Sequence, residues 1–317
     1  MNTKWLLIFL SAFLGGATEG KATLLPPSYI SAVVAIGSNQ LTPVTGGVPQ
    51  LKWVTEGTGF FYGYKVHDDP EPSKRKYAIF LVTAAHVIRG HIAVDAVNVS
   101  VRLDAVDTSA KTVDIPIKLS EWFFHPDPNV DLAAVSVSPN FLKENGLQSM
   151  FFANDEMASG REKLKELGTS AGDGVFVLGF PMGLSGAQKN YVIVRQGAVA
   201  RISEFLDGAA KSFLIDSFVF PGNSGGPVIL RPEIAAIDGT KSNGKALLIG
   251  VVQSYQPYTD VAISAQTKHP RITFEENSGL AVVLPVDGID EMLRQRVEAI
   301  KLNLEKGDAS PREQTRQ

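Results

Sequence analysis

The sequence predicts an all-β protein, and three observations indicate this fold class. About a dozen short runs are β-branched or alternate between apolar and polar residues. Gly, Pro, Asp and Asn separate these runs. One stretch near the C-terminus has clear helical periodicity. The pattern fits a β-sandwich or a pair of barrels, and the number of runs suits two six-stranded antiparallel barrels with a C-terminal helix.

The expected strands extend over most of the chain. They are Ser31–Ile36, Gly59–Val66, Tyr77–Thr83, Val97–Leu103, Val113–Leu119, Leu132–Val137, Gly174–Leu178, Tyr191–Val194, Gly197–Ile202, Ser212–Ser217, Val228–Leu230, Ala246–Gln253 and Gly279–Leu284. Three polar or charged stretches between them are expected to be loops: His67–Lys76, Pro232–Lys245 and Tyr255–Pro270. Such loops surround a site or decorate the surface.

The C-terminal helix is predicted from one apolar stripe. The stripe consists of Ile289, Leu293, Val297, Ile300 and Leu304, spaced by three or four residues. Asp287 is expected at the N-cap, and acidic residues follow it in the first turn. We expect this helix to pack on the last barrel, with a partner-binding helix as the alternative. Ala158–Leu167 fits a second helix or a charged loop.

Composition excludes several classes of function. The chain has 317 residues, with 30 Lys and Arg against 33 Asp and Glu, and a formal net charge of −3. A nucleic-acid binder would normally be basic. The absence of Cys excludes disulfides, thiolate metal sites and cysteine nucleophiles. No apolar run reaches the ~18 residues that a membrane-spanning helix needs.

The N-terminus has the pattern of a secretory signal peptide. Lys4 precedes the apolar stretch Trp5–Leu14, and small residues follow it. A buried N-terminal strand or helix is the alternative. Cleavage is expected after Ala17 or Ala22, which places the mature protein outside the cytoplasm, in the periplasm or secreted. We therefore expect a signal peptide over residues 1–22, one folded domain over 23–306 and a polar tail over 307–317.

A glycine-rich segment provides the strongest chemical signal. In Pro221–Val228, Ser224 follows Gly222 and Asn223 and precedes two further glycines. Such a segment can be simply a tight turn. A nucleophilic serine, however, also needs an exposed position on a sharply turning backbone, which glycine permits. It needs backbone N–H groups that converge on an oxyanion, and those of Gly222 and Ser224 can do so.

Two further segments contain the partners that a nucleophilic serine requires. His86 follows an apolar run and the residues Thr83, Ala84 and Ala85. Because the ordinary pKa of a histidine side chain lies near neutral pH, such a residue can act as the base. A satisfied core histidine is the alternative. Asp131 directly precedes an apolar run, where it can orient the histidine or merely cap a turn. Asp127 is the local competitor, although its Pro-flanked turn favours a solvated role.

The other histidines show no spacing typical of a metal site. These are His67, His91, His125 and His269, and we expect them to be surface or structural residues. No metal and no cofactor is expected.

Together, these segments resemble the trypsin/chymotrypsin-like serine peptidases. The resemblance depends on Thr-Ala-Ala-His at 83–86, Asp-Leu-Ala at 131–133 and Gly-Asn-Ser-Gly-Gly-Pro at 222–227, in this order. Other similar segments are Gly57–Phe60, Val177–Pro181, Arg195–Val199, Gly250–Val252 and Ser278–Val282, of which Val177–Pro181 and Arg195–Val199 resemble the bacterial, HtrA-like branch. The chain after Val286 is too short for the PDZ domain of HtrA proteins. The resemblance implies a chymotrypsin-like fold of two barrels with the site in the cleft between them.

The resemblance also implies roles for individual residues. Ser224 would be the nucleophile, His86 the general base and acid, and Asp131 the residue that orients His86. The N–H groups of Gly222 and Ser224 would form the oxyanion hole. The substrates would be proteins or peptides. The alternatives are a catalytically silent peptidase fold that serves as a binding or regulatory module, and ester hydrolysis as the physiological role. The oligomeric state is left open.

Four residues are expected to bind substrate. By the same resemblance, Phe218 lies at the base of the specificity pocket, and Gln253, Ser254 and Tyr255 follow the substrate backbone. An uncharged base disfavours a buried cation, so we expect cleavage after Val, Ala, Leu or Ile. A shift in register would instead bring Asp216 to the pocket base.

Overall fold

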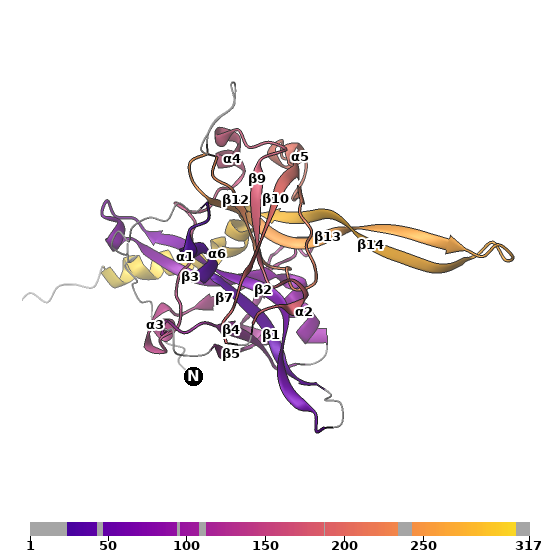
Figure 1. Ribbon diagram of the computed structural model, residues 1–317. Coiled ribbons are helices and arrows are strands. Elements are labelled where there is room, and N and C mark those ends of the chain that lie inside the picture. Colours follow the sequence, from indigo (N-terminus) through magenta and orange to yellow (C-terminus); the bar gives the residue numbers. More distant parts are fainter. Residues whose placement is uncertain are drawn as a thin grey trace, which may run out of the picture.

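The computed structural model describes residues 24–42, 47–93, 96–107, 112–186, 188–233 and 243–308. Its strands form two mainly antiparallel sheets that pack against each other, with α6 alongside both (Figure 1). The expected all-β, chymotrypsin-like fold is therefore confirmed. The expected signal peptide, residues 1–22, lies outside the described residues.

The second sheet is a closed six-stranded barrel. Its strands are β9 (Gly174–Gly179), β10 (Ile193–Arg201), β11 (Phe213–Asp216), β12 (Pro227–Leu230), β13 (Leu247–Ile263) and β14 (Pro270–Pro285), in the order β10-β11-β14-β13-β12-β9. Closure removes the exposed strand edges that an open sheet would present. Inward-facing Val177, Ile215, Val228 and Ile249 are fully buried in its interior.

The first sheet has eight strands and curls into a half-barrel that does not close, whereas two six-stranded barrels were expected. Its strands are β1 (Val33–Thr42), β2 (Gln50–His67), β3 (Lys76–Ala84), β4 (Asn98–Leu103), β5 (Val113–Lys118), β6 (Phe123–Phe124), β7 (Leu132–Val137) and β8 (Phe152–Ala153). The order is β5-β4-β1-β2-β3-β7-β6, and β8 pairs with β2. Closure would require β5 to pair with β6, but β6 has only two residues. The result is a half-barrel.

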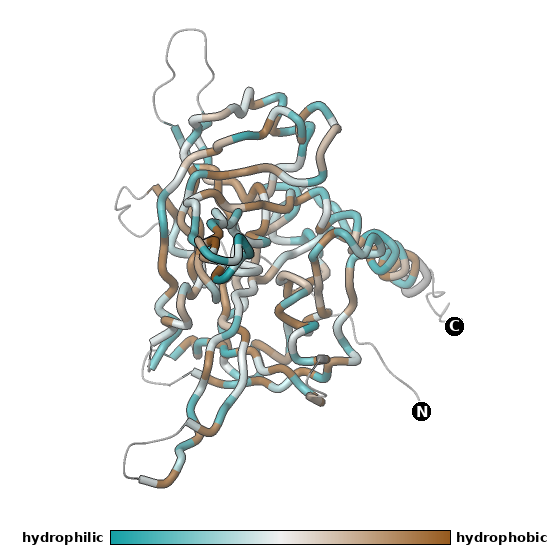
Figure 2. Tube along the Cα trace, turned by 90° about the vertical axis from the view of Figure 1, so that its right-hand side faces the viewer, coloured by the Kyte–Doolittle hydropathy of each residue, from teal (hydrophilic) through white to brown (hydrophobic). Residues whose placement is uncertain are grey.

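Both faces of β3 and of the central part of β2 are buried, which explains their apolar runs. Phe61 and Leu81 face the interior of the half-barrel. Phe60 and Val82, one residue away, face the core that the two sheets share. Figure 2 shows the hydrophobic stretches of the chain, in brown, gathered in the interior of the molecule. A strand that is covered on one face only would alternate between apolar and polar residues.

The expected C-terminal helix is α6 (Val286–Asp308), and its apolar stripe packs into the shared core. Asp287 is not its N-cap, because the helix already begins at Val286. Its carboxylate instead accepts hydrogen bonds from Arg161 N at 3.0 and 3.2 Å. Arg161 is the first residue of α4 (Arg161–Leu167), so Asp287 satisfies an N-terminal N–H of another helix. The segment Ala158–Leu167 is thus helical from Arg161 onward.

The remaining helices are short. They are α1 (Pro27–Ser31), η1 (Pro72–Lys74), α2 (Ala85–Ala93), η2 (Leu119–Glu121), α3 (Pro139–Glu144), η3 (Pro181–Gly183) and α5 (Ser203–Leu206). Among the described residues, no helix is both long enough and apolar enough to cross a membrane.

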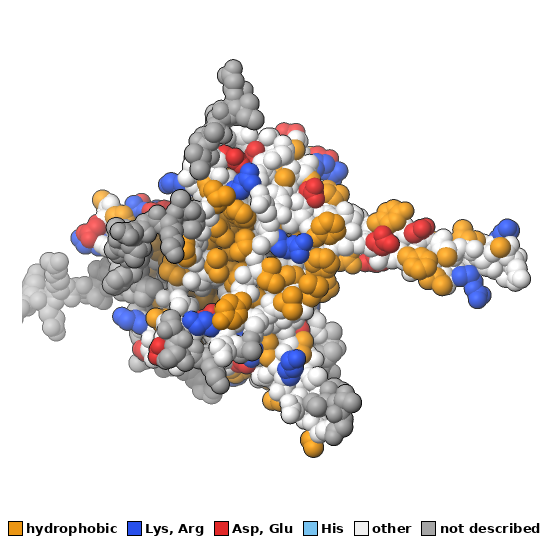
Figure 3. All heavy atoms as spheres, viewed as in Figure 1, with side chains coloured by type: hydrophobic (Ala, Val, Ile, Leu, Met, Phe, Trp, Pro, Cys, Tyr) orange, Lys and Arg blue, Asp and Glu red, His pale blue; other side chains and the backbone are white. Residues whose placement is uncertain are grey.

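The expected loop Tyr255–Pro270 is instead most of a projecting hairpin. β13 and β14 continue well beyond the barrel as a two-stranded arm (Figure 1), with pairing from Pro257↔Asn277 to Ile263↔Pro270. We call residues 257–277 the arm. Its apolar side chains are exposed among charged ones (Figure 3), including Tyr258, Ile263 and Phe274. The prediction was wrong because neither face of the arm meets a core, so its sequence lacks the alternation that marks a half-buried strand.

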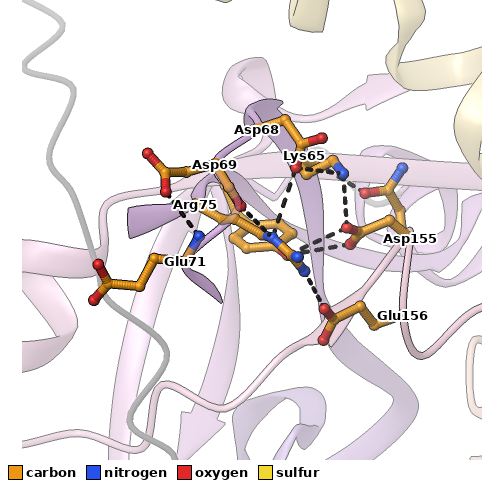
Figure 4. A network of polar contacts seen from close by, with 9 residues as sticks. Lys65, Asp68, Asp69, Glu71, Arg75, Asp155 and Glu156 are labelled. Carbon is orange, nitrogen blue, oxygen red and sulfur yellow. Dashed lines mark hydrogen bonds and ion pairs between the residues drawn. The ribbon is translucent and has the colours of Figure 1, made fainter. Parts of the chain in front are cut away.

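The charged loop His67–Lys76 connects β2 to β3 and forms an ion-pair network (Figure 4). Lys65 Nζ lies 2.9 Å from Asp68 and 3.0 Å from Asp155, and Arg75 pairs with Glu156. The loop precedes β3, whereas His86 follows it. Since a strand rises about 3.3 Å per residue, the loop lies at the opposite end of β3 from His86. Pro232–Lys245 lies largely outside the described residues.

Candidate active site

Two neighbouring strands bring His86 and Asp131 together. His86 lies in the first turn of α2, directly after β3, and Asp131 directly precedes β7. These strands pair through Ala84↔Leu132, so their adjoining residues meet at one end of the sheet. Ala85 N donates to Asp131 O at 3.0 Å. The backbone pairing of β3 and β7 therefore places the two residues next to each other.

The Asp131 carboxylate contacts His86 at two points. Oδ1 accepts a hydrogen bond from His86 N at 2.8 Å, and Oδ2 lies 2.5 Å from His86 Nδ1. Because an ionised carboxylate only accepts hydrogen bonds, Nδ1 carries the proton. Nε2 of a neutral ring is then the free acceptor. The Asp131 side chain is 15% exposed and that of His86 50%, so a fixed carboxylate orients a solvent-accessible imidazole.

Asp127 has different partners. Its carboxylate pairs with Lys211 and accepts hydrogen bonds from Asn129 N and Nδ2 at 2.9 and 3.0 Å. These contacts, that of Lys211 first, lower the pKa of Asp127 to about 2. Lys211 belongs to the second barrel, so this ion pair links the two halves of the molecule. Of the two aspartates, Asp131 is the one that contacts His86.

Ser224 lies in a tight turn that depends on glycine. Gly222 and Gly225 have positive φ angles of 98° and 83°. A Cβ on Gly222 would lie 2.3 Å from Phe180 O, and one on Gly225 would lie 2.2 Å from Thr58 O. No other residue fits either position. The Ser224 hydroxyl donates to Gln253 O at 3.4 Å, and no hydrogen bond joins it to His86 among the residues that the structure describes.

The Ser224 turn presents two free N–H groups. Asn223 N donates to Phe220 O, Gly225 N to Val252 O, and Gly226 N to Asn223 O, at 2.8–2.9 Å. Within the described part of the chain, the N–H groups of Gly222 and Ser224 have no intramolecular acceptor. They are the pair that the sequence predicted for an oxyanion. Such preorganised donors can stabilise negative charge that develops on a substrate oxygen.

The four predicted substrate-binding residues lie near this turn or at the base of the arm. Gln253 contacts Ser224 through its carbonyl group, and Ser254 is exposed and pairs with Val282. Tyr255 donates from its hydroxyl to Glu275 Oε1 at 2.6 Å. The structure thus adds Glu275, which the sequence analysis placed in no motif.

Phe218 is 49% exposed, and its ring lies beside Gly279, where a Cβ would be 3.4 Å from it. Its ring therefore forms an apolar surface rather than a buried floor. Asp216, the alternative residue for the pocket base, is an exposed β11 residue that pairs with Ala198 and Leu280.

Among the other histidines, His91 and His125 contact residues other than Ser224. His91 Nε2 lies 2.8 Å from Glu56 Oε2, and His125 Nε2 lies 3.7 Å from Glu291 Oε2. His67 and His269 are exposed. Among the described residues, no three or more His, Asp or Glu side chains are arranged to hold a metal ion.

Comparison with known proteins agrees with this geometry. A search of the curated proteins gives no match. The family model of the trypsin-like peptidase domain matches residues 57–233, which is more than half of the chain and includes His86, Asp131 and Ser224. The protein therefore belongs to the trypsin-like peptidase domain family, as the sequence resemblance predicted.

Proposed function

We propose that this peptidase is a serine endopeptidase that acts through Ser224, His86 and Asp131. The main support is the double contact of Asp131 with His86, which leaves Nε2 of the ring free to accept a proton. The two free N–H groups in the Ser224 turn are the second requirement of this chemistry. No cofactor takes part in the proposed reaction.

The first half of the reaction forms an acyl-enzyme. The Ser224 side chain turns from Gln253 O toward His86, and its proton passes to Nε2 as Oγ attacks the scissile carbonyl carbon. The carbonyl oxygen becomes an oxyanion that the N–H groups of Gly222 and Ser224 stabilise. His86 then gives the proton to the leaving amine, and the C–N bond breaks. Asp131 stabilises the imidazolium throughout.

The second half regenerates the enzyme. Water attacks the ester carbonyl while His86 accepts its proton, and the same N–H groups stabilise the second oxyanion. His86 returns the proton to Ser224 Oγ as the ester bond breaks, which releases the carboxylic acid product. A deprotonated His86 is required at the start of both halves, so protonation of the ring stops turnover.

A serine-directed fluorophosphonate probe tests the proposal. We expect the wild-type protein to be labelled and Ser224→Ala not to be labelled, with both folded by circular dichroism. Folded wild-type protein that is neither labelled nor able to cleave peptides would favour the alternative, a catalytically silent binding or regulatory module.

The proposed substrates are proteins or peptides with a small or medium apolar residue at the P1 position. The exposed apolar ring of Phe218 at the expected pocket supports this preference, because it offers no charge to pair with Lys or Arg. Cleavage of a diverse peptide library should occur mainly after Val, Ala, Leu or Ile. A dominant preference for Lys or Arg would contradict this assignment.

We also propose that the protein acts outside the cytoplasm. The support is the N-terminal pattern of Lys4 followed by Trp5–Leu14 and small residues. Export should remove the N-terminal residues, so the mature protein in the extracytoplasmic fraction should begin just after Ala17 or Ala22. N-terminal sequencing measures this, and an unprocessed chain that starts at Met1 would contradict it.

A further inference from the structure

We infer that Thr58 is a positioning residue that holds the oxyanion-hole segment of the second barrel from the first sheet. The inference rests on the proposed function, because it assigns a role within the same reaction. Thr58 lies on β2, is fully buried, and belongs to neither the His86 nor the Ser224 segment. Two hydrogen bonds join it to the Ser224 turn, so it links the half-barrel to that turn.

Thr58 forms two hydrogen bonds to the carbonyl groups on either side of Asn223. Its N–H donates to Ser224 O at 2.9 Å, and its Oγ1 hydroxyl donates to Gly222 O at 2.6 Å. A hydroxyl has one proton, so the contact with Gly222 uses it. Oγ1 also accepts a hydrogen bond from Phe180 N at 3.2 Å. Thr58 therefore constrains the backbone that presents the N–H groups of Gly222 and Ser224.

A second contact fixes the peptide on the other side of Gly222. Met182 N donates to Pro221 O at 2.7 Å. In a trans peptide the C=O and N–H groups point in opposite directions, so this bond directs the Gly222 N–H away from Met182. Met182 has a φ of 56°, a left-handed conformation that non-glycine residues rarely adopt. The peptides before and after Gly222 are thus held by Met182 N and Thr58 Oγ1.

The surroundings of Thr58 are shaped around its polar atoms. A Cβ on Gly179 would lie 2.7 Å from Thr58 Oγ1, and one on Gly225 would lie 2.2 Å from Thr58 O. Thr83 Oγ1 donates to the same carbonyl oxygen of Thr58 at 2.7 Å. Thr58 is fully buried. Without its hydroxyl, the Gly222 carbonyl would lose the hydrogen bond from Thr58 Oγ1 in the interior of the protein, which is unfavourable. Gly179 and Gly225 therefore leave room for Thr58, and Thr58 donates the hydrogen bond to Gly222 O.

The test compares Thr58→Ala with Thr58→Ser. Both variants lack the methyl group, so they differ only in the hydroxyl. We expect Thr58→Ala to lower kcat by about 10- to 100-fold, less than the ~10²–10³-fold loss of an oxyanion donor itself, with KM changed by less than about threefold. We expect Thr58→Ser to keep kcat within about threefold of wild type. Concentrations are normalised by fluorophosphonate titration of active sites.

Thr55 provides the matched control. It is also a buried threonine on β2, and its hydroxyl donates to Ser185 Oγ at 3.0 Å. Among the described residues, no hydrogen bond joins Thr55 to the Ser224 turn. Thr55→Ala should keep kcat close to that of Thr55→Ser. If Thr58→Ala keeps wild-type kcat, or if Thr55→Ala lowers kcat as much as Thr58→Ala does, the inference is overturned.

A transition-state mimic distinguishes a role of Thr58 in positioning the oxyanion hole from a general role in the stability of the protein. A peptidyl aldehyde forms a tetrahedral adduct with the serine, whereas the corresponding peptide acid binds without one. Thr58→Ala should weaken the aldehyde by about tenfold or more relative to wild type and leave the acid unchanged. Equal loss of both ligands would indicate a general structural defect and overturn the inference. Wild-type protein that reacts with neither the probe nor the aldehyde would instead refute the proposed function.

Discussion

At the scale of single residues, two carboxylates of one short loop, those of Asp127 and Asp131, have different partners. Asp127 and Asp131 lie four positions apart. Asp127 pairs with Lys211 at the surface, whereas Asp131 contacts the backbone and ring of His86. The two carboxylates therefore differ in role because they differ in partner.

Substitution of these two aspartates should have very different effects. Asp131→Asn keeps the shape of the side chain but no longer stabilises the imidazolium or fixes the proton on Nδ1. We expect kcat to fall by about 10⁴-fold, as in the triad template for this family. Asp127→Asn, the matched control, should keep kcat within about threefold, because it loses only an exposed ion pair. Steady-state kinetics on one peptide substrate measures both, and equal losses would contradict the assignment.

At the scale of elements, α6 joins the half-barrel through the partly buried carboxyl group of Asp290. Tyr62, fully buried on β2, donates to Asp290 Oδ1 at 2.8 Å. Burial, opposed by the bond from Tyr62, raises the pKa of Asp290 to about 6 from an ordinary value of 3.8, and Asp287 adds to the rise. Ionised Asp290 is therefore less favourable in the folded protein than in the unfolded chain.

This shift predicts how stability changes with pH. Since the folded state holds the proton more tightly, the contribution of Asp290 is most favourable below about pH 4 and is lost as pH rises through about 6. Asp290→Asn keeps an acceptor for Tyr62 and removes the ionisation. We expect it to raise the free energy of unfolding at pH 7 by about 1–3 kcal/mol and to have little effect at pH 4. Urea denaturation at both pH values measures the difference; a variant that is less stable at pH 7 would contradict the assignment.

At the scale of the whole molecule, the two sheets and α6 share one core, while the arm stands outside it (Figures 1 and 3). Isolated two-stranded ribbons are marginally stable in water, so the arm contributes little to the fold. Its strands are anchored where Asn277 Nδ2 donates to Val219 O at 2.6 Å and Tyr255 contacts Glu275.

Shortening the arm should therefore leave the barrels intact. We propose to replace Val261–Thr273 with Asn-Gly, a pair that favours a tight hairpin turn. The melting temperature should change by less than about 3 °C, and the rate of fluorophosphonate labelling by less than about twofold. Differential scanning fluorimetry and the labelling assay measure these values. A large fall in either would mean that the arm supports the barrels or the site.

The fold class and the order of the chemical motifs could be predicted from local sequence patterns. These features depend on local demands: Gly222 and Gly225 where φ is positive, an apolar run before His86, and an apolar run after Asp131. Such demands act within a few residues, so they are visible in the sequence.

Which residues meet depends on how the whole chain packs. β3 and the central part of β2 are covered on both faces, whereas the arm is covered on neither. None of these strands therefore shows strict alternation, and the arm was expected to be a loop. The open edge of the half-barrel depends on the length of β6, and the contacts of Thr58 depend on how the two sheets pack. These features arise from residues far apart in the chain, and no local pattern specifies their pairing.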